Sequence, residues 1–103
     1  MKYAIIWTPE ALSTFEERIK YLKYIGQKKK TNFKKRVNEY FEIFEEKPPV
    51  GNTIPCKLKG VYICLIIKQV SLIYRINLPA QEIQLISFID NRQNPGYIRK
   101  HKG

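Results

Sequence analysis

The sequence predicts an α+β fold: an N-terminal strand, an antiparallel two-helix hairpin and then a C-terminal antiparallel β-meander, with the helices on one face of the sheet. Two patterns predict this order. Apolar residues recur at helical spacing in the first half, and short β-branched segments alternate with turn residues in the second half. The chain has 103 residues, which is the size of one domain. We therefore expect a single domain over 1–103, in which 91–103 form a basic, flexible tail.

The first helix has clear start and stop signals. A short β-rich segment over 3–7 is expected to form the first strand. Thr8 then offers a hydroxyl N-cap, and Pro9 fits the first helical position. Gly26 is expected to end the helix. Between these signals runs one apolar stripe: Ala11, Leu12, Phe15, Ile19, Leu22 and Ile25.

A second helix is expected after a basic connector over 27–31. Pro48 and Pro49 cannot continue a helix, so it must end by Lys47. The connector is too short for any arrangement except an antiparallel hairpin. The apolar stripe of this helix consists of Phe33, Val37, Tyr40, Phe41 and Phe44.

The charges of the second helix run against its dipole. Lysines 28–30 lie near its start, whereas Glu45 and Glu46 lie at its end. Each misplaced exposed charge costs about 0.3–1 kcal/mol, and the cost of the lysines shrinks if the helix begins after them. A role in binding would explain the lysine run, although solvated runs of this kind are more common.

The second half reads as a β-meander. The turn-like segment PPVGN precedes it, Lys59-Gly60 forms a turn within it, and 78–81 form a looser turn. Since these connections are short, neighbouring strands should pair antiparallel. The expected strands span 54–58, 62–68, 71–77 and 82–89.

Alternation in the last two strands predicts which side chains share a face. In the third meander strand, Leu72, Tyr74 and Ile76 share one face, and the other carries Ser71, Ile73, Arg75 and Asn77. In the last strand, one face carries Ile83, Leu85 and Ile89, and the other carries Ile86 and Phe88. One face must carry the helices. The mixed face is explained equally by a protein partner or by partial burial beneath the tail.

Charge is the main compositional bias. The net charge is +10, and residues 47–103 hold nine Lys or Arg against two acids. Nucleic acid is the first partner that this charge suggests, followed by an acidic protein and an anionic membrane surface. No segment has the about 20 apolar residues of a membrane span, and the N-terminus lacks a signal-peptide pattern. We therefore expect a cytoplasmic protein without a membrane partner.

Cys56 and Cys64 are the only cysteines. A hairpin centred on Gly60 would place them directly across from each other, which makes a disulfide geometrically feasible. In a reducing cytoplasm, two free and half-buried thiols are expected instead. Two cysteines and one histidine do not make a zinc site, so we expect no metal and no cofactor.

Five short segments, in their order and spacing, resemble the RelE/ParE family of toxins from bacterial type II toxin–antitoxin systems. They are IIWTPEAL at the start, PPVG after the second helix, LKG before the meander, SLIYRI in its central strand and DNRQNP after the last strand. The resemblance implies a small toxin that arrests growth and is neutralised by a cognate antitoxin, which wraps it with an amphipathic segment. It also implies a homodimer or a toxin–antitoxin hetero-oligomer.

The resemblance leaves two targets open. ParE-like members act on DNA gyrase, whereas RelE-like members cleave mRNA on the ribosome without a metal. Ser71 stands where RelE-like members often place arginine, and Ile63 and Leu65 stand where they place lysines. The resemblance therefore favours gyrase. The alternatives are a ribosome-dependent mRNA endonuclease and, from a different class, a non-toxic basic nucleic-acid-binding module.

The candidate site residues are mostly basic. If the protein is a nuclease, the resemblance implies catalytic roles for Arg92 and Tyr97 in the tail. Arg75 has two interpretations: a contact to an anion, or an ion pair with Asp90 or Glu82 on the next strand. The residues expected to contact nucleic acid or the target are Lys57, Lys59, Lys68, Arg75, Arg92, Arg99 and Lys100.

Overall fold

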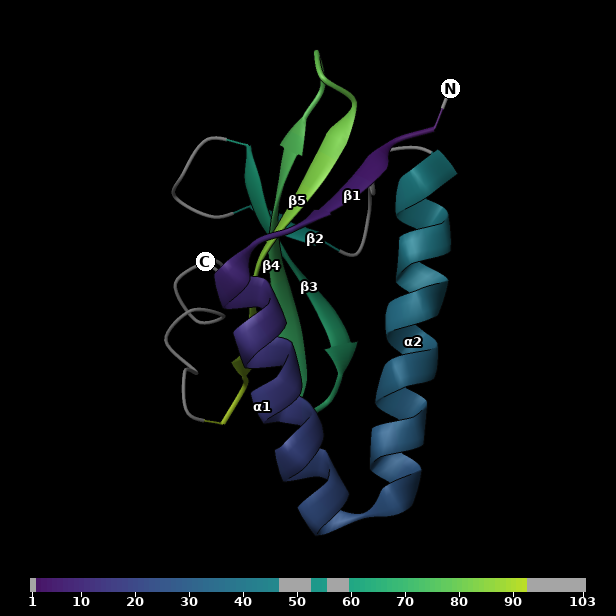
Figure 1. Cartoon of the computed structure of the whole chain (residues 1–103), viewed down its shortest axis with the longest axis vertical. Coiled ribbons are helices and arrows are strands. Elements are labelled where there is room, and N and C mark those ends of the chain that lie inside the picture. Colours follow the sequence, from purple (N-terminus) through teal and green to yellow (C-terminus); the bar gives the residue numbers. More distant parts are fainter. Residues whose placement is uncertain (1, 47–52, 56–59, 93–103) are drawn as a thin grey trace.

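The computed structural model describes residues 2–46, 53–55 and 60–92. Two helices pack on one face of a five-stranded sheet, as Figure 1 shows. The elements are β1 (Ala4–Trp7), α1 (Pro9–Ile25), α2 (Gln27–Glu46), β2 (Thr53–Pro55), β3 (Val61–Ile67), β4 (Val70–Asn77) and β5 (Glu82–Asp90). The predicted α+β class and element order are confirmed.

The sheet has the strand order β1-β5-β4-β3-β2. Strands β2 to β5 pair antiparallel with their neighbours, so the predicted meander is confirmed. Strand β1 pairs parallel with β5, from Ala4 opposite Glu82 to Trp7 opposite Leu85. The first and last strands of the chain are therefore neighbours in the sheet. Beyond Leu85, this edge of β5 has no partner in β1 and is covered by α1 instead.

Helix α1 begins and ends at the predicted residues. Thr8 adopts an extended backbone, and its Oγ1 accepts a hydrogen bond from the Ala11 amide at 3.1 Å. Pro9 occupies the start of the helix. The Gly26 amide closes the helix by donating to the Leu22 carbonyl at 2.9 Å. The backbone of Gly26 is extended, at φ 162°, rather than left-handed.

The predicted basic connector over 27–31 is wrong, because α2 begins at Gln27. The Gly26 carbonyl accepts hydrogen bonds from the amides of Lys29 and Lys30, at 3.1 and 3.3 Å. Gly26 therefore ends one helix with its amide and starts the next with its carbonyl. As a consequence, lysines 28–30 occupy the first turn of α2, which contains no acidic residue.

The main core lies between the helices and the sheet. Aromatic rings form much of it: Phe88 of β5 lies 5.2 Å from Phe15 of α1 and 6.0 Å from Phe33 of α2, centroid to centroid. Tyr74 of β4 lies 5.0 Å from Phe44. Full burial of such rings stabilises the fold by about 1.5–3 kcal/mol each.

The prediction of which side chains of the last strand share a face is wrong at the C-terminal end of that strand. Ile73 pairs with Ser87, but Tyr74 pairs with Leu85, so Ile86 is an extra residue and forms a β-bulge. A bulge shifts the alternation by one residue. Phe88 consequently faces the helices together with Leu85, while Ile89 turns to the opposite face.

The face of the sheet away from the helices has an apolar cluster of its own. Val61, Ile63, Ile73 and Ile89 are buried there, and Ile86 packs against them. These residues are therefore buried, whereas most of the tail that one explanation places over them lies outside the described residues. Leu65 of β3 remains 52% exposed.

The register also corrects the expectation for the cysteines. Cys64 pairs with Thr53 across β2 and β3, so the hairpin is not centred on Gly60 and the residue opposite Cys64 is Thr53. Gly60 does lie in a turn, with φ 79°. Cys64 is free and buried, and Cys56 lies outside the described residues. Within the described ranges, no helix is long and apolar enough to cross a membrane.

Candidate target-binding site

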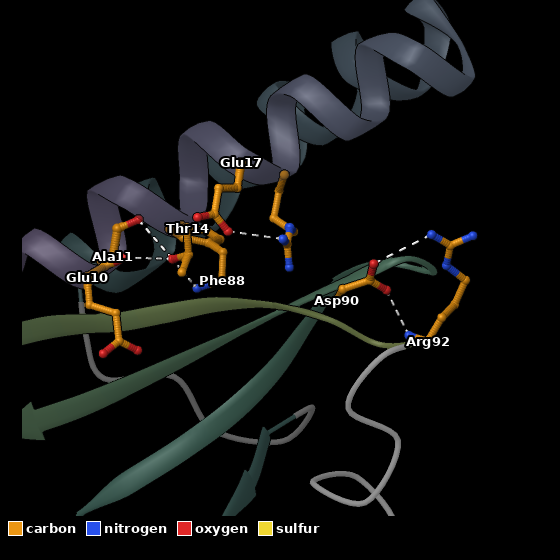
Figure 2. Close-up of polar contacts among 8 residues, drawn as sticks. Glu10, Ala11, Thr14, Glu17, Phe88, Asp90 and Arg92 are labelled. Carbon is orange, nitrogen blue, oxygen red and sulfur yellow. Dashed lines mark hydrogen bonds and ion pairs between the residues drawn. The ribbon is translucent and has the colours of Figure 1, made fainter.

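Arg92 lies just after β5 and is bound by Asp90, the last residue of that strand. One carboxylate oxygen of Asp90 accepts a hydrogen bond from the Arg92 amide at 2.8 Å, and the other lies 3.5 Å from Nη2 of the Arg92 side chain. Figure 2 shows both contacts. The Asp90 side chain is only 5% exposed, whereas that of Arg92 is 57% exposed. A buried acid thus anchors an accessible guanidinium.

Helix α1 supplies an aromatic ring, that of Tyr21, which contacts the same guanidinium. The central carbon of the Arg92 guanidinium lies 4.4 Å from the centroid of the Tyr21 ring. A cation over an aromatic face is attracted by the quadrupole of the ring. The hydrogen bond to Asp90 and the partnership with Tyr21 raise the pKa of Arg92, so it stays charged at all physiological pH values. With one face on Tyr21, the exposed part of Arg92 can bind an anion.

The electrostatics of Asp90 show that two arginines act on its carboxylate. Burial by itself raises the pKa of Asp90. The hydrogen bonds and charge of Arg92, together with the charge of Arg18, outweigh burial and hold that pKa below its ordinary value. Arg18 is itself half-buried and lies 3.3 Å from Glu17. Asp90 therefore stays ionised as the counterion of these arginines.

A second predicted site residue, Lys68, lies at this end of the sheet, in the β3–β4 turn that is hydrogen-bonded to Asn91. The Asn91 side-chain amide donates to the Lys68 carbonyl at 3.0 Å, and its backbone amide donates to Gln69 at 2.9 Å. The exposed Lys68 in the β3–β4 turn is thus tied to the residue that precedes Arg92. Among the described residues, Lys68 and Arg92 are the predicted site residues that lie at this end of the sheet.

Arg75 lies towards the other end of the sheet, opposite Val61 and Gln84. The predicted ion pair with Asp90 or Glu82 is wrong, because Asp90 pairs with Arg92 and, among the described residues, Arg75 forms no ion pair. Arg75 is exposed and remains available to an anion. The other candidates, Lys57, Lys59, Tyr97, Arg99 and Lys100, lie outside the described residues.

Sequence reasoning missed the contribution of α1 to this site. Thr14, Arg18 and Tyr21 follow one another at intervals of four and three residues, so they share one side of the helix. Thr14 Oγ1 accepts a hydrogen bond from the Phe88 amide at 2.9 Å, which fixes β5 beneath the helix (Figure 2). This polar row beside the apolar stripe was the signal that could have revealed the site.

Solved structures of proteins from bacterial toxin–antitoxin systems share this fold. The chromosomal ParDE system from P. aeruginosa matches with a TM-score of 0.66 and 19% identity, over 86% of this chain and 96% of that chain. The YoeB/ParE toxin from Agrobacterium tumefaciens matches with a TM-score of 0.61 and 14% identity, over 84% and 96%. The RelBE2 toxin–antitoxin complex from Mycobacterium tuberculosis matches with a TM-score of 0.57 and 14% identity, over 87% and 99%.

The sequence itself gives the family. Residues 5–95 match the family model described as the ParE toxin of the type II toxin–antitoxin system parDE. The chain therefore belongs to the ParE toxin family, and the resemblance to RelE/ParE toxins is confirmed. No curated protein matches the chain significantly.

Proposed function

We propose that this ParE-family toxin arrests bacterial growth by acting on DNA gyrase and that a cognate antitoxin neutralises it. The observation that carries this proposal is the chemistry of the sheet face away from the helices. Ile63 and Ser71, at positions where RelE-like nucleases place basic residues, are 2% and 1% exposed, and Leu65 is apolar. At these three positions the sheet face therefore lacks the cations that would stabilise the charge of a phosphate during RNA cleavage.

Arg92 and Lys68 are the described residues that we assign to target binding. A gyrase poison needs a binding surface and no acid–base pair, and an exposed guanidinium held by Asp90 and Tyr21 is such a surface element. Since the guanidinium is already oriented, binding costs little side-chain entropy. The match to the ParE family model supports the same target class.

An antitoxin is the second proposed partner. The neighbours of the same fold include a complex of YoeB with YefM from Staphylococcus aureus and a heterotetramer of the same pair. By analogy, we expect a hetero-oligomer in which an amphipathic antitoxin segment covers apolar positions such as Leu65, which is 52% exposed. Acidic residues of that segment would neutralise the exposed guanidinium of Arg92.

Inducible expression in bacteria, with plasmid supercoiling and RNA 5′ ends followed in the same culture, tests this function. The wild type should stop growth and leave plasmids less negatively supercoiled. Arg92→Ala should restore growth. Arg36→Ala is the matched control, because Arg36 also lies over a tyrosine ring, 5.8 Å from Tyr40, and near an acid, 3.8 Å from Glu39.

The two alternatives give different results in this experiment. New RNA 5′ ends within codons at unchanged supercoiling would identify a ribosome-dependent mRNA endonuclease. Normal growth with soluble, antitoxin-free protein would leave only the non-toxic nucleic-acid-binding module. Full toxicity of Arg92→Ala would remove Arg92 from the site.

A further inference from the structure

The tip of the helical hairpin is a concentrated basic surface that the proposed site does not include. From Arg18 to Arg36 the chain contains nine Lys or Arg and no Asp or Glu. Figure 1 shows the turn between α1 and α2 projecting beyond the ends of the strands. Seven of the nine are lysines, which we call the tip lysines: Lys20, Lys23, Lys28, Lys29, Lys30, Lys34 and Lys35.

The tip lysines are available to a partner. Six of them are exposed, and Lys30 is half-buried. The ion pairs of the described residues join Arg18 to Glu17, Arg36 to Glu39 and Arg92 to Asp90. No tip lysine therefore has an acidic partner within the part of the chain that the structure describes.

Folding does not explain this charge. Lysines 28–30 occupy the first turn of α2, where the helix dipole is positive and cations are unfavourable. The last turn of α2 contains no basic residue to compensate. The positive helix end and the lysine ammonium groups repel one another, and an anion placed at the tip would relieve that repulsion.

The spacing of the charges fits a nucleic-acid duplex. Lys20 lies five residues before Ile25 and Lys35 lies eight residues after Gln27, so at 1.5 Å per residue all seven lie within about 12 Å of the hairpin turn. Duplex DNA carries one negative charge per about 1.7 Å of its axis, or about seven charges over that length. A single strand carries half that density.

The residue types at the tip suit phosphates rather than bases. Lysine is a point charge without the planar fork with which arginine reads guanine. Tyr24, between the lysines at the end of α1, is 89% exposed, and tyrosine hydroxyls donate hydrogen bonds to phosphate oxygens. Backbone contacts of this kind position a protein on DNA without selecting a sequence.

We propose that the tip lysines and Tyr24 dock this protein on the phosphate backbone of duplex DNA. The choice of DNA over duplex RNA rests on the proposed function, because gyrase acts on DNA. The helical hairpin would then hold the toxin on DNA near the enzyme, while Arg92 at the sheet end contacts the protein target.

Fluorescence anisotropy of a labelled DNA duplex, measured with the full chain from 50 to 300 mM salt, tests this docking. The triple variant Lys28→Gln, Lys29→Gln and Lys30→Gln should bind more weakly and lower the slope of log affinity against log salt by about 2.7, or about 0.9 per lost contact. The control variant Lys2→Gln, Ser13→Glu and Leu78→Glu removes the same net charge at exposed positions away from the tip, and should keep the wild-type slope.

Thermal melting of the same variants separates binding from folding. Removing the lysines from the first turn of α2 should leave the melting temperature unchanged or raise it, so a loss of binding cannot come from misfolding. Equal losses of binding in the two triple variants would overturn the proposal. Tighter binding to an RNA duplex or to polyglutamate than to DNA would also overturn it.

The assay contains no gyrase, so its result is independent of the proposed function. A protein that binds DNA through its tip but leaves gyrase supercoiling unchanged would refute the gyrase target alone. A tip variant that binds DNA like the wild type would refute the docking surface alone, whatever its effect on gyrase.

Discussion

The guanidinium carbon of Arg92 lies 4.4 Å from the centroid of the Tyr21 ring, so a residue beyond the last strand is positioned by the first helix. These residues are 71 positions apart in the sequence. The contact exists because Thr8 and Thr14 fasten α1 along β5, by hydrogen bonds of 2.7 Å to the Leu85 carbonyl and 2.9 Å from the Phe88 amide. The candidate site is therefore a product of helix docking on the sheet.

Tyr21→Ala should weaken target binding while leaving the fold intact. The ring orients the guanidinium and contributes a cation–π attraction, whose loss at an exposed site corresponds to about a twofold to fivefold loss of affinity. The measurement is the toxin concentration that halves gyrase supercoiling activity. Tyr21→Phe keeps the aromatic face and should behave like the wild type. If Phe and Ala weaken binding equally, the phenol hydroxyl rather than the ring face carries the effect.

Asp90 should make the stability of the protein depend on acid pH. Its pKa in the folded state is lowered, so its ionised form favours folding above the unfolded value of about 3.8, and this stability is lost as pH falls through the folded value. Melting temperatures from pH 3 to pH 7 should therefore fall more steeply below pH 4 in the wild type than in Asp90→Asn.

At neutral pH, Asp90→Asn should melt at a lower temperature than the wild type, because the buried counterion of Arg92 and Arg18 is gone. Glu42→Gln, which removes one exposed negative charge from α2, controls for the change in net charge. Identical acid profiles for Asp90→Asn and the wild type would show that the carboxylate does not couple to folding.

Cys64 should be unreactive in the native protein. Burial raises the pKa of Cys64 to about 12, and the thiolate is the form that reacts with alkylating agents. In a Cys56→Ser variant, where Cys64 is the remaining thiol, iodoacetamide at pH 8 should label the protein in urea and not in buffer. Rapid labelling in buffer would mean that β3 opens without global unfolding.

The sequence predicted those parts of the fold that local chemistry determines. Thr8, Pro9 and Gly26 mark the bounds of α1, because caps and proline act within a few residues. The start of α2 was missed because the residue before it is Gly26, which has no side chain that could cap the helix and reveal its start in the sequence. A glycine that ends one helix gives no sign that another begins at the next residue.

The candidate site was predictable only in part. Arg92 was found because basic residues at strand ends often carry function. Its partners were missed because Asp90 and Tyr21 meet it through register and helix docking. The wrong ion pair for Arg75 has the same cause, since the register places Asp90 opposite Val70, five residues before Arg75 along β4.

The bulge at Ile86 yields the clearest test of the register. Regular alternation predicts that Phe88 faces away from the helices, whereas the structure buries it completely against Phe15 and Phe33. Phe88→Ala should therefore cost about 3–5 kcal/mol of unfolding free energy, the usual cost of truncating a buried aromatic ring.

Ile86→Ala is the comparison for Phe88→Ala, because Ile86 is half-buried on the opposite face and should cost clearly less. Urea denaturation measures both costs if the slope of the transition is unchanged. A larger loss in Ile86→Ala than in Phe88→Ala would mean that the strand alternates regularly. Thr14 would then not lie over the Phe88 amide, and α1 could not place Tyr21 beneath Arg92 as it does here.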